Sequence, residues 1–136
     1  MPLRYTGGCA CGALRYEISG EPAAMLNCQC RQCQRESGTG HQSHLTFVAA
    51  DVSLQGEPAF FESVGEGGTV KRRGFCRTCG NPVYLQFPAM PEVLIVTPSS
   101  LDDPSLFKPH FVTWTQSGQA WDHLDPAIVR HQKMPA

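Results

Sequence analysis

Apolar and polar residues alternate in several short segments of this chain, and a period of two is typical of half-buried β-strands. Residues 13–18, which read Ala-Leu-Arg-Tyr-Glu-Ile, show the alternation most clearly. Similar runs predict further strands at 24–28, 44–48, 59–63, 70–75, 83–87, 93–97 and 110–115, with a strand or a turn at 5–11. The pattern therefore predicts an all-β or β-rich fold of short antiparallel strands.

One short helix is expected among these strands. Residues 29–37 can form about two helical turns, and Gly38 follows at the position where glycine commonly ends a helix. The glycine-rich segment 65–68 and the Asp- and Pro-containing segment 100–104 predict turns. Because 136 residues are the size of one domain, we expect a single compact domain over 1–136, with an irregular tail at 126–136.

The overall charge excludes some classes of partner. A formal net charge of −1 gives no general attraction to nucleic acid or to an anionic membrane. Residues 1–5 lack the apolar stretch of a secretory signal, and no run approaches the roughly 18 apolar residues of a membrane helix. We therefore expect a cytoplasmic protein with neither a nucleic-acid nor a membrane partner. Cysteines stay reduced in that compartment and are available to bind metal.

The seven cysteines carry the chemical information of the sequence, and all of them lie in three tight clusters. A C-x-C pair and a distant C-x₂-C pair together supply the four thiolates of a closed, structural zinc site: Cys9, Cys11, Cys76 and Cys79. Glycine follows both pairs, at Gly12 and Gly80, where a metal-binding turn often needs a positive φ. The alternatives are a disulfide and chance clustering.

The remaining cluster has the spacing C-x-C-x₂-C and offers three ligands: Cys28, Cys30 and Cys33. Three protein ligands leave one corner of a zinc tetrahedron open, which is the arrangement of catalytic zinc sites. Two alternatives remain. His41 or His44 could close the site as a second structural zinc site, or the cluster could be free of metal.

The charge of an open three-thiolate site favours sulfur chemistry. Three thiolates and Zn²⁺ sum to −1, so the metal is a weaker Lewis acid than a zinc held by neutral histidines. Hydrolysis is therefore not its obvious task. A thiol that enters the fourth position would lose its proton and stay electron-rich, which suits attack on a small electrophile. The H-x-E and P-C-x₂-C signature of the zinc deaminases is missing from the sequence.

Four motifs resemble those of the glutathione-dependent formaldehyde-activating enzyme family. They are Gly8-Cys-Ala-Cys-Gly, Cys28-x-Cys-x₂-Cys-x-Arg with the following Ser37-Gly38, Arg73-Gly-Phe-Cys-x₂-Cys-Gly, and Ser100-Leu-Asp-Asp-Pro. With the two tryptophans they span about residues 5–125. The order of the motifs matches the family. The chain differs from it at Gln29, where the family often has histidine, and in the segment 112–118, where the common pattern H-I-W-x₂-S-R would place a histidine at Val112 and an arginine at Gly118.

The resemblance implies a β-rich fold on a zinc-ribbon-like core, with one structural and one catalytic zinc ion. It also implies a carbon–sulfur lyase that handles the adduct of glutathione, or a similar thiol, with a small aldehyde such as formaldehyde. We expect a monomer or a small homo-oligomer. Within the basic run 71–73, Arg73 is the best candidate to bind substrate, because it lies near the Cys76 turn. The competing hypothesis is a non-catalytic, zinc-stabilised binding module.

Overall fold

The smaller of two sheets contains the N-terminal strands. The computed structural model describes residues 3–135. Three antiparallel strands lie in the order β1-β2-β5, with bounds β1 (Arg4–Gly8), β2 (Arg15–Ser19) and β5 (Asp51–Gln55). The alternation seen in the sequence is real, because Tyr16 and Ile18 of β2 are fully buried while Glu17 between them is exposed.

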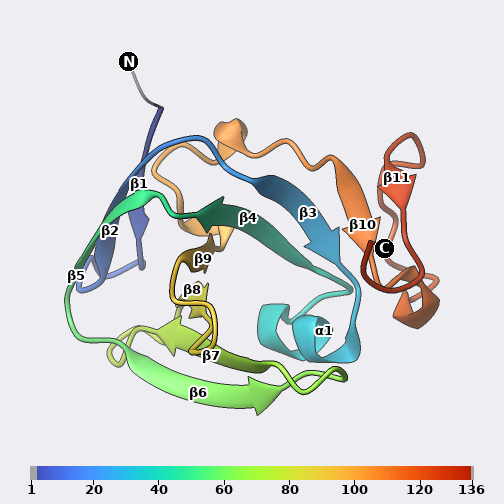
Figure 1. The fold of residues 1–136 in the computed structure, drawn as a ribbon, viewed down its shortest axis with the longest axis horizontal. Coiled ribbons are helices and arrows are strands. Elements are labelled where there is room, and N and C mark those ends of the chain that lie inside the picture. The colour runs from blue at the N-terminus through green and yellow to red at the C-terminus, as the bar shows by residue number, and fades with distance from the viewer. Residues whose placement is uncertain (1–2, 136) are drawn as a thin grey trace.

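The larger sheet bends around the only α-helix within residues 3–135. Its order is β11-β10-β3-β4-β9-β8-β7-β6. The bounds are β3 (Ala24–Cys28), α1 (Arg31–Ser37), β4 (Gln42–Val48), β6 (Ala59–Val64), β7 (Val70–Phe75), β8 (Pro82–Gln86), β9 (Val93–Val96), β10 (Phe111–Thr113) and β11 (Val129–Arg130). Figure 1 shows α1 inside the bend, with β3 and β4 on one side and β6 and β7 on the other.

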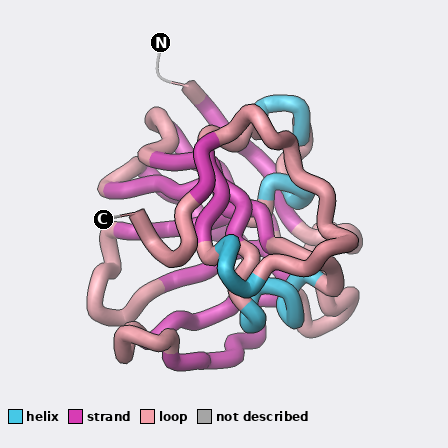
Figure 2. Tube along the Cα trace, turned by 90° about the vertical axis from the view of Figure 1, so that its right-hand side faces the viewer, coloured by secondary structure: helices cyan, strands magenta, loops and turns pink. Residues whose placement is uncertain are grey.

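The predicted β-rich, mainly antiparallel fold is confirmed, and three details of the prediction are corrected. The segment 51–55, which was not predicted as a strand, forms β5. β10 pairs in parallel with both β3 and β11, whereas only antiparallel strands were expected. The tail at 126–136 was expected to be irregular, yet it contributes β11. Figure 2 shows how much of the chain lies in strands, with only short helical turns.

The main core lies where the two sheets meet. Tyr16 of the small sheet and Phe47 of the large sheet are fully buried in the same cluster, and Tyr5 packs edge-on against Phe47 at 5.3 Å between ring centroids. Cys9 and Cys76 belong to this core. A second, smaller cluster contains Leu26, Cys28 and Cys33. Each group of cysteines is thus attached to its own apolar cluster.

The loop after β9 ties the small sheet to the large one. Gly7 of β1 forms an isolated bridge with Leu101, and the Tyr16 hydroxyl lies 2.7 Å from the Ser100 hydroxyl. Glycine is required at position 7, because a Cβ there would lie 2.3 Å from the Ser100 carbonyl oxygen. Asp102 accepts two hydrogen bonds from Arg15, at 2.9 and 2.6 Å, and one from Thr6 at 2.7 Å.

The Arg15–Asp102 ion pair allows a prediction about stability. Hydrogen bonds from Arg15 and then from Thr6 lower the pKa of Asp102 to about 2. The stabilisation is therefore present at pH values above the ordinary carboxyl pKa and is lost as pH falls through about 2. Because both side chains are substantially exposed, at 39% and 49%, we expect Asp102→Asn to lower the free energy of unfolding at pH 7 by less than about 1 kcal/mol.

Urea titrations of Asp102→Asn, Arg15→Met and the double variant, at low salt and in 1 M NaCl, measure this contribution. The coupling between the two residues should shrink in high salt, because exposed charges are screened. A coupling that salt leaves unchanged would contradict an exposed electrostatic contact.

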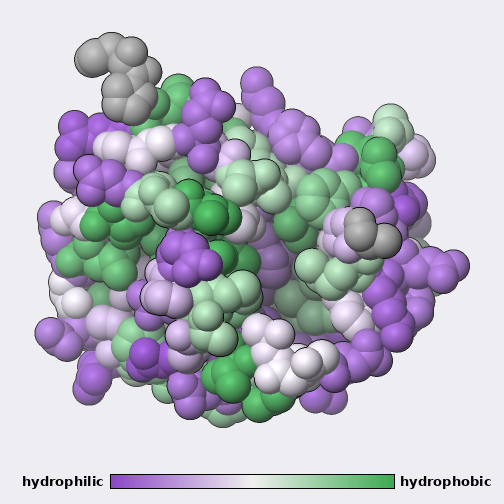
Figure 3. Space-filling view, in the orientation of Figure 1, coloured by the Kyte–Doolittle hydropathy of each residue, from purple (hydrophilic) through white to green (hydrophobic). Residues whose placement is uncertain are grey.

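The surface carries polar and apolar residues side by side. Figure 3 shows them interleaved on the face seen in Figure 1, with a hollow near its centre. No helix within the described part of the chain is long and apolar enough to cross a membrane.

Candidate metal centres

The first group of cysteines brings together four sulfurs from two distant turns. Cys9 and Cys11 lie in the turn after β1, and Cys76 and Cys79 lie in the turn after β7. The Cys9 and Cys11 sulfurs are 3.7 Å apart, and those of Cys11 and Cys76 are 3.6 Å apart. A tetrahedron with Zn–S bonds of about 2.3 Å has edges of about 3.8 Å. The four thiols can therefore hold a metal ion.

The backbone of both turns is shaped to support negatively charged sulfurs. The predicted positive φ is present at Gly12 (82°) and at Gly80 (76°). The Leu14 amide donates to the Cys9 sulfur at 3.3 Å, and the amides of Thr78 and Cys79 donate to the Cys76 sulfur at 3.3 and 3.4 Å. A hydrogen bond from the Asn81 backbone, and then one from Cys11, lowers the pKa of Cys79 to about 6. Hydrogen bonds from backbone amides to these sulfurs stabilise the thiolate form, which is the form that binds a metal ion.

The second group contains three sulfurs at the start of α1: Cys28, Cys30 and Cys33. Cys28 ends β3, and α1 begins at Arg31, two residues later than predicted. Cys30 is consequently the N-cap residue, and its sulfur accepts a hydrogen bond from the Cys33 amide at 3.2 Å. Gly38 ends the helix at a φ of 76°, as its position in the sequence predicted. All three sulfurs lie within 4.8 Å of one another.

The three thiols share their protons unequally. Hydrogen bonds from Cys28 and then from Cys33 lower the pKa of Cys30 to about 2, whereas the contacts with Cys28 and Cys30 raise the pKa of Cys33. Cys30 is the most exposed of the three, since Cys28 and Cys33 are buried. The sulfur that faces solvent is thus also the one that most readily carries negative charge.

Neither nearby histidine joins the three sulfurs as a fourth ligand atom. His44 Nε2 lies 4.0 Å from the Cys33 sulfur and 3.0 Å from Gln42 Oε1, to which it donates. Burial, followed by the charge of Lys71, lowers the pKa of His44 to about 4. His41 Nδ1 instead lies 3.0 Å from both carboxylate oxygens of Asp122. Both histidines therefore have other partners.

A cavity of about 390 Å³ opens beside Cys30. The hairpin between β6 and β7 contributes Val64 and Glu66 to its lining, and the segment after β10 contributes Trp114 and Ser117. Phe87 and Val64 make part of the lining apolar. Cys30, the least buried residue of the second group, therefore lines a space large enough for a small molecule.

An ion pair that sequence reasoning missed lies beside this cavity. Lys71 of β7 lines the cavity and donates from Nζ to Glu36 Oε2 of α1 at 3.0 Å. The side chain of Glu36 is 0% exposed and that of Lys71 is 16% exposed. The sequence did hold one sign that Glu36 lies near the second group of cysteines: it follows Cys33 by three residues, and residues three apart are neighbours on a helix.

Arg73, the predicted substrate-binding residue, lies two positions further along β7 and does not line this cavity. Its guanidinium group lies 5.8 Å from the ring centroid of Phe61 and 5.9 Å from that of Phe75. Its Nε is buried without a hydrogen-bond partner. The role of Arg73 in binding substrate stays a prediction.

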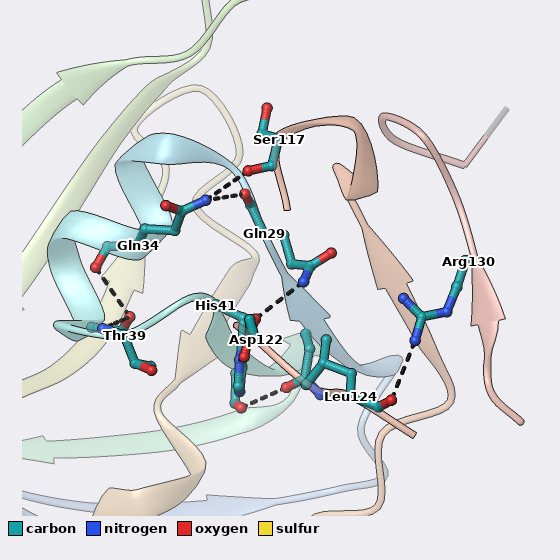
Figure 4. A network of polar contacts seen from close by, with 11 residues as sticks. Gln29, Gln34, Thr39, His41, Ser117, Asp122, Leu124 and Arg130 are labelled. Atoms are coloured by element: carbon teal, nitrogen blue, oxygen red, sulfur yellow. Dashed lines mark hydrogen bonds and ion pairs between the residues drawn. The ribbon is translucent and has the colours of Figure 1, made fainter. Parts of the chain in front are cut away.

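A polar network anchors the helix to the C-terminal segment (Figure 4). The Gln34 amide donates to the carbonyl oxygens of Gln29 and Ser117 at 2.8 and 2.9 Å, and Gln29 donates to Asp122 at 3.1 Å. Two of the positions that differ from the common family pattern, Gln29 and Gly118, are neighbours here, because a Cβ at Gly118 would lie 2.8 Å from Gln29 Oε1. Both differences therefore change the same region, next to the second group of cysteines.

The fold and the two groups of cysteines define a class of protein, β-rich with one four-thiol and one three-thiol group that could each hold a metal ion. A family model described as glutathione-dependent formaldehyde-activating enzyme matches residues 4–117. The chain belongs to this family.

A solved structure of a protein from Rhodobacter sphaeroides is similar in fold. The two chains are 22% identical, and the match covers 93% of this chain and 98% of the other, with a TM-score of 0.55. At this identity the similarity concerns the fold alone.

Proposed function

We propose that this protein is a zinc-dependent enzyme of the carbon–sulfur lyase type, which forms or cleaves the adduct of a thiol with a small aldehyde. Glutathione and formaldehyde are the proposed pair, because the family to which the chain belongs is described by them. The single observation that carries an enzymatic role is the half-buried Cys30, which belongs to a group of three thiols and lines a cavity.

The two groups of cysteines would have different roles. Four thiols at the spacing of a zinc tetrahedron suit a closed structural site that joins the turn after β1 to the turn after β7: Cys9, Cys11, Cys76 and Cys79. The three-thiol group suits a catalytic site with one open position: Cys28, Cys30 and Cys33. A zinc ion bound there would favour the thiolate form of an incoming thiol.

The protein's own residues would bind and orient the reactants. Val64 and Phe87 would offer apolar contacts to the reactants, while the open side of the cavity would admit the longer thiol. Arg73 remains a candidate for a substrate carboxylate, because its buried Nε has no partner within residues 3–135. The seven free thiols support a reducing compartment, the cytoplasm, as the place of action.

Metal content and thiol binding test this proposal. Native mass spectrometry of the metal-replete protein should show two zinc ions, one of which mild chelation removes first, since an open site is more accessible than a closed one. Glutathione should bind only while the second ion is present. A single inert zinc ion would favour the non-catalytic binding module. Two ions without glutathione binding would remove glutathione as the substrate.

A further inference from the structure

One face of α1 carries a row of three functional groups. Cys30 caps the helix, and Cys33 and Glu36 follow at intervals of three residues, so that each is the neighbour of the next along the helix surface. Lys71 of β7 contacts Glu36, the last of the three, with its Nζ 3.0 Å from Glu36 Oε2. The lysine is therefore held by the carboxylate on the helix face that also carries two of the three thiols.

The ammonium group of Lys71 has hydrogen-bonding capacity to spare. It carries three N–H donors, and Glu36 is the one acceptor that it reaches among residues 3–135. Lys71 lines the cavity together with Cys30, and 16% of its side chain is exposed. Two donors thus remain for a molecule that occupies the cavity.

The surroundings keep Lys71 positively charged. Burial on its own disfavours the charged form, but the Glu36 carboxylate, 3.0 Å from Lys71 Nζ, offsets that cost and favours the ammonium. A buried ion pair contributes little net stability compared with apolar packing. Its position beside the cavity and the thiols therefore calls for a role other than stability.

We propose that Lys71 is a catalytic residue, whose ammonium group donates a hydrogen bond to the aldehyde oxygen as that oxygen becomes negatively charged. This role rests on the proposed function. As the thiolate sulfur forms the C–S bond, the electron pair of the C=O π bond moves to oxygen, and the oxyanion then takes a proton from water to become a hydroxyl group. In the reverse direction the hydroxyl gives its proton back to hydroxide, the electron pair on oxygen re-forms the C=O π bond, and the C–S electron pair leaves with sulfur as a thiolate. Lys71 keeps its own proton throughout, and Glu36 holds it in place.

The test compares Lys71→Met, Lys71→Arg and the control Lys108→Met, which removes the charge of an exposed lysine. Exchange NMR at equilibrium measures the rate at which formaldehyde enters and leaves the glutathione adduct. We expect Lys71→Met to lower kcat by about 100-fold, the usual effect of removing one oxyanion donor. Lys71→Arg, which keeps a charged donor, should retain activity within about tenfold of the wild type, and Lys108→Met should match the wild type.

Zinc content, zinc affinity and glutathione affinity distinguish this role from a structural one. All three should stay unchanged in Lys71→Met, because the lysine acts on the aldehyde oxygen. A Lys71→Met variant with wild-type kcat overturns the proposal, as does one whose lower rate follows from lost zinc or weaker glutathione binding. A wild-type protein that does not accelerate the exchange overturns the proposed function, and the role of Lys71 falls with it.

Discussion

Cys30→Ser is expected to abolish the acceleration of thiol–aldehyde exchange while leaving the protein folded. Cys30 is the least buried member of the three-thiol group, and its loss would leave two buried sulfurs to hold a second metal ion. A serine hydroxyl at the N-cap position still accepts the hydrogen bond from the Cys33 amide, because serine is among the preferred N-cap residues. The helix should therefore form normally, with a change in stability of less than about 1 kcal/mol in the metal-free protein.

Exchange NMR, native mass spectrometry and circular dichroism together measure this outcome. We expect the exchange rate to fall to the uncatalysed level and the zinc content to fall from two ions to one, with an unchanged spectrum. Arg35→Gln, which alters an exposed side chain of the same helix, serves as the matched control and should keep both ions. Wild-type activity in Cys30→Ser would contradict a catalytic role for the three-thiol group.

Cys79→Ser is expected to unfold the protein. The four-thiol group joins turns that are 65 positions apart at Cys11 and Cys76, and it lies against the main core. Structural zinc sites contribute on the order of 10 kcal/mol of apparent binding free energy. This is comparable to the whole free energy of unfolding of a domain, about 5–15 kcal/mol. With only Cys9, Cys11 and Cys76 left to bind the metal, the variant should therefore keep too little stability for the native fold.

Thermal unfolding followed by circular dichroism is the direct measurement. Cys79→Ser should lack a cooperative transition, or show one at a temperature far below that of the wild type. Thr78→Ser changes an exposed neighbour in the same turn that is not a ligand, and it should unfold like the wild type. If Cys79→Ser and Cys30→Ser had equal effects on folding, the division into one structural and one catalytic site would be wrong.

Local patterns were sufficient to predict most of the strands. Tyr16 and Ile18 of β2 turned inward as the alternation required, because one face of the small sheet packs on the core. β5 also alternates, at Val52 and Leu54, but these side chains are only partly covered, and Leu54 is 39% exposed. A strand that buries so little apolar surface is hard to recognise from its sequence alone. β5 is stabilised mainly by its pairing with β2.

Long-range pairings could not be predicted from one sequence. The parallel contact of β10 with β3 joins Phe111 to Leu26, and nothing near either residue encodes it. β10 is also cut short, because Trp114 has a φ of 57° in the left-handed region. This conformation turns the chain at the point where Trp114 becomes a wall of the cavity beside Cys30.

The grouping of the cysteines was predictable because spacing alone limits which sulfurs can meet. The surroundings of the three-thiol group were not. Lys71 stands 35 positions from Glu36, so only the tertiary fold, which brings β7 close to the helix, joins them. Within the basic run 71–73 the sequence favoured Arg73, on the basis of its nearness to Cys76 along the chain. In the fold it is Lys71 that lines the cavity.

The two groups of cysteines also differ in when they can assemble on the ribosome. The three-thiol group spans residues 28–33, so a nascent chain can present all of its ligands soon after they emerge. The four-thiol group must wait until Cys79 has been synthesised and a long loop has closed, which is slow for contacts of high sequence separation. During translation the three-thiol group can therefore be complete before the four-thiol group has formed.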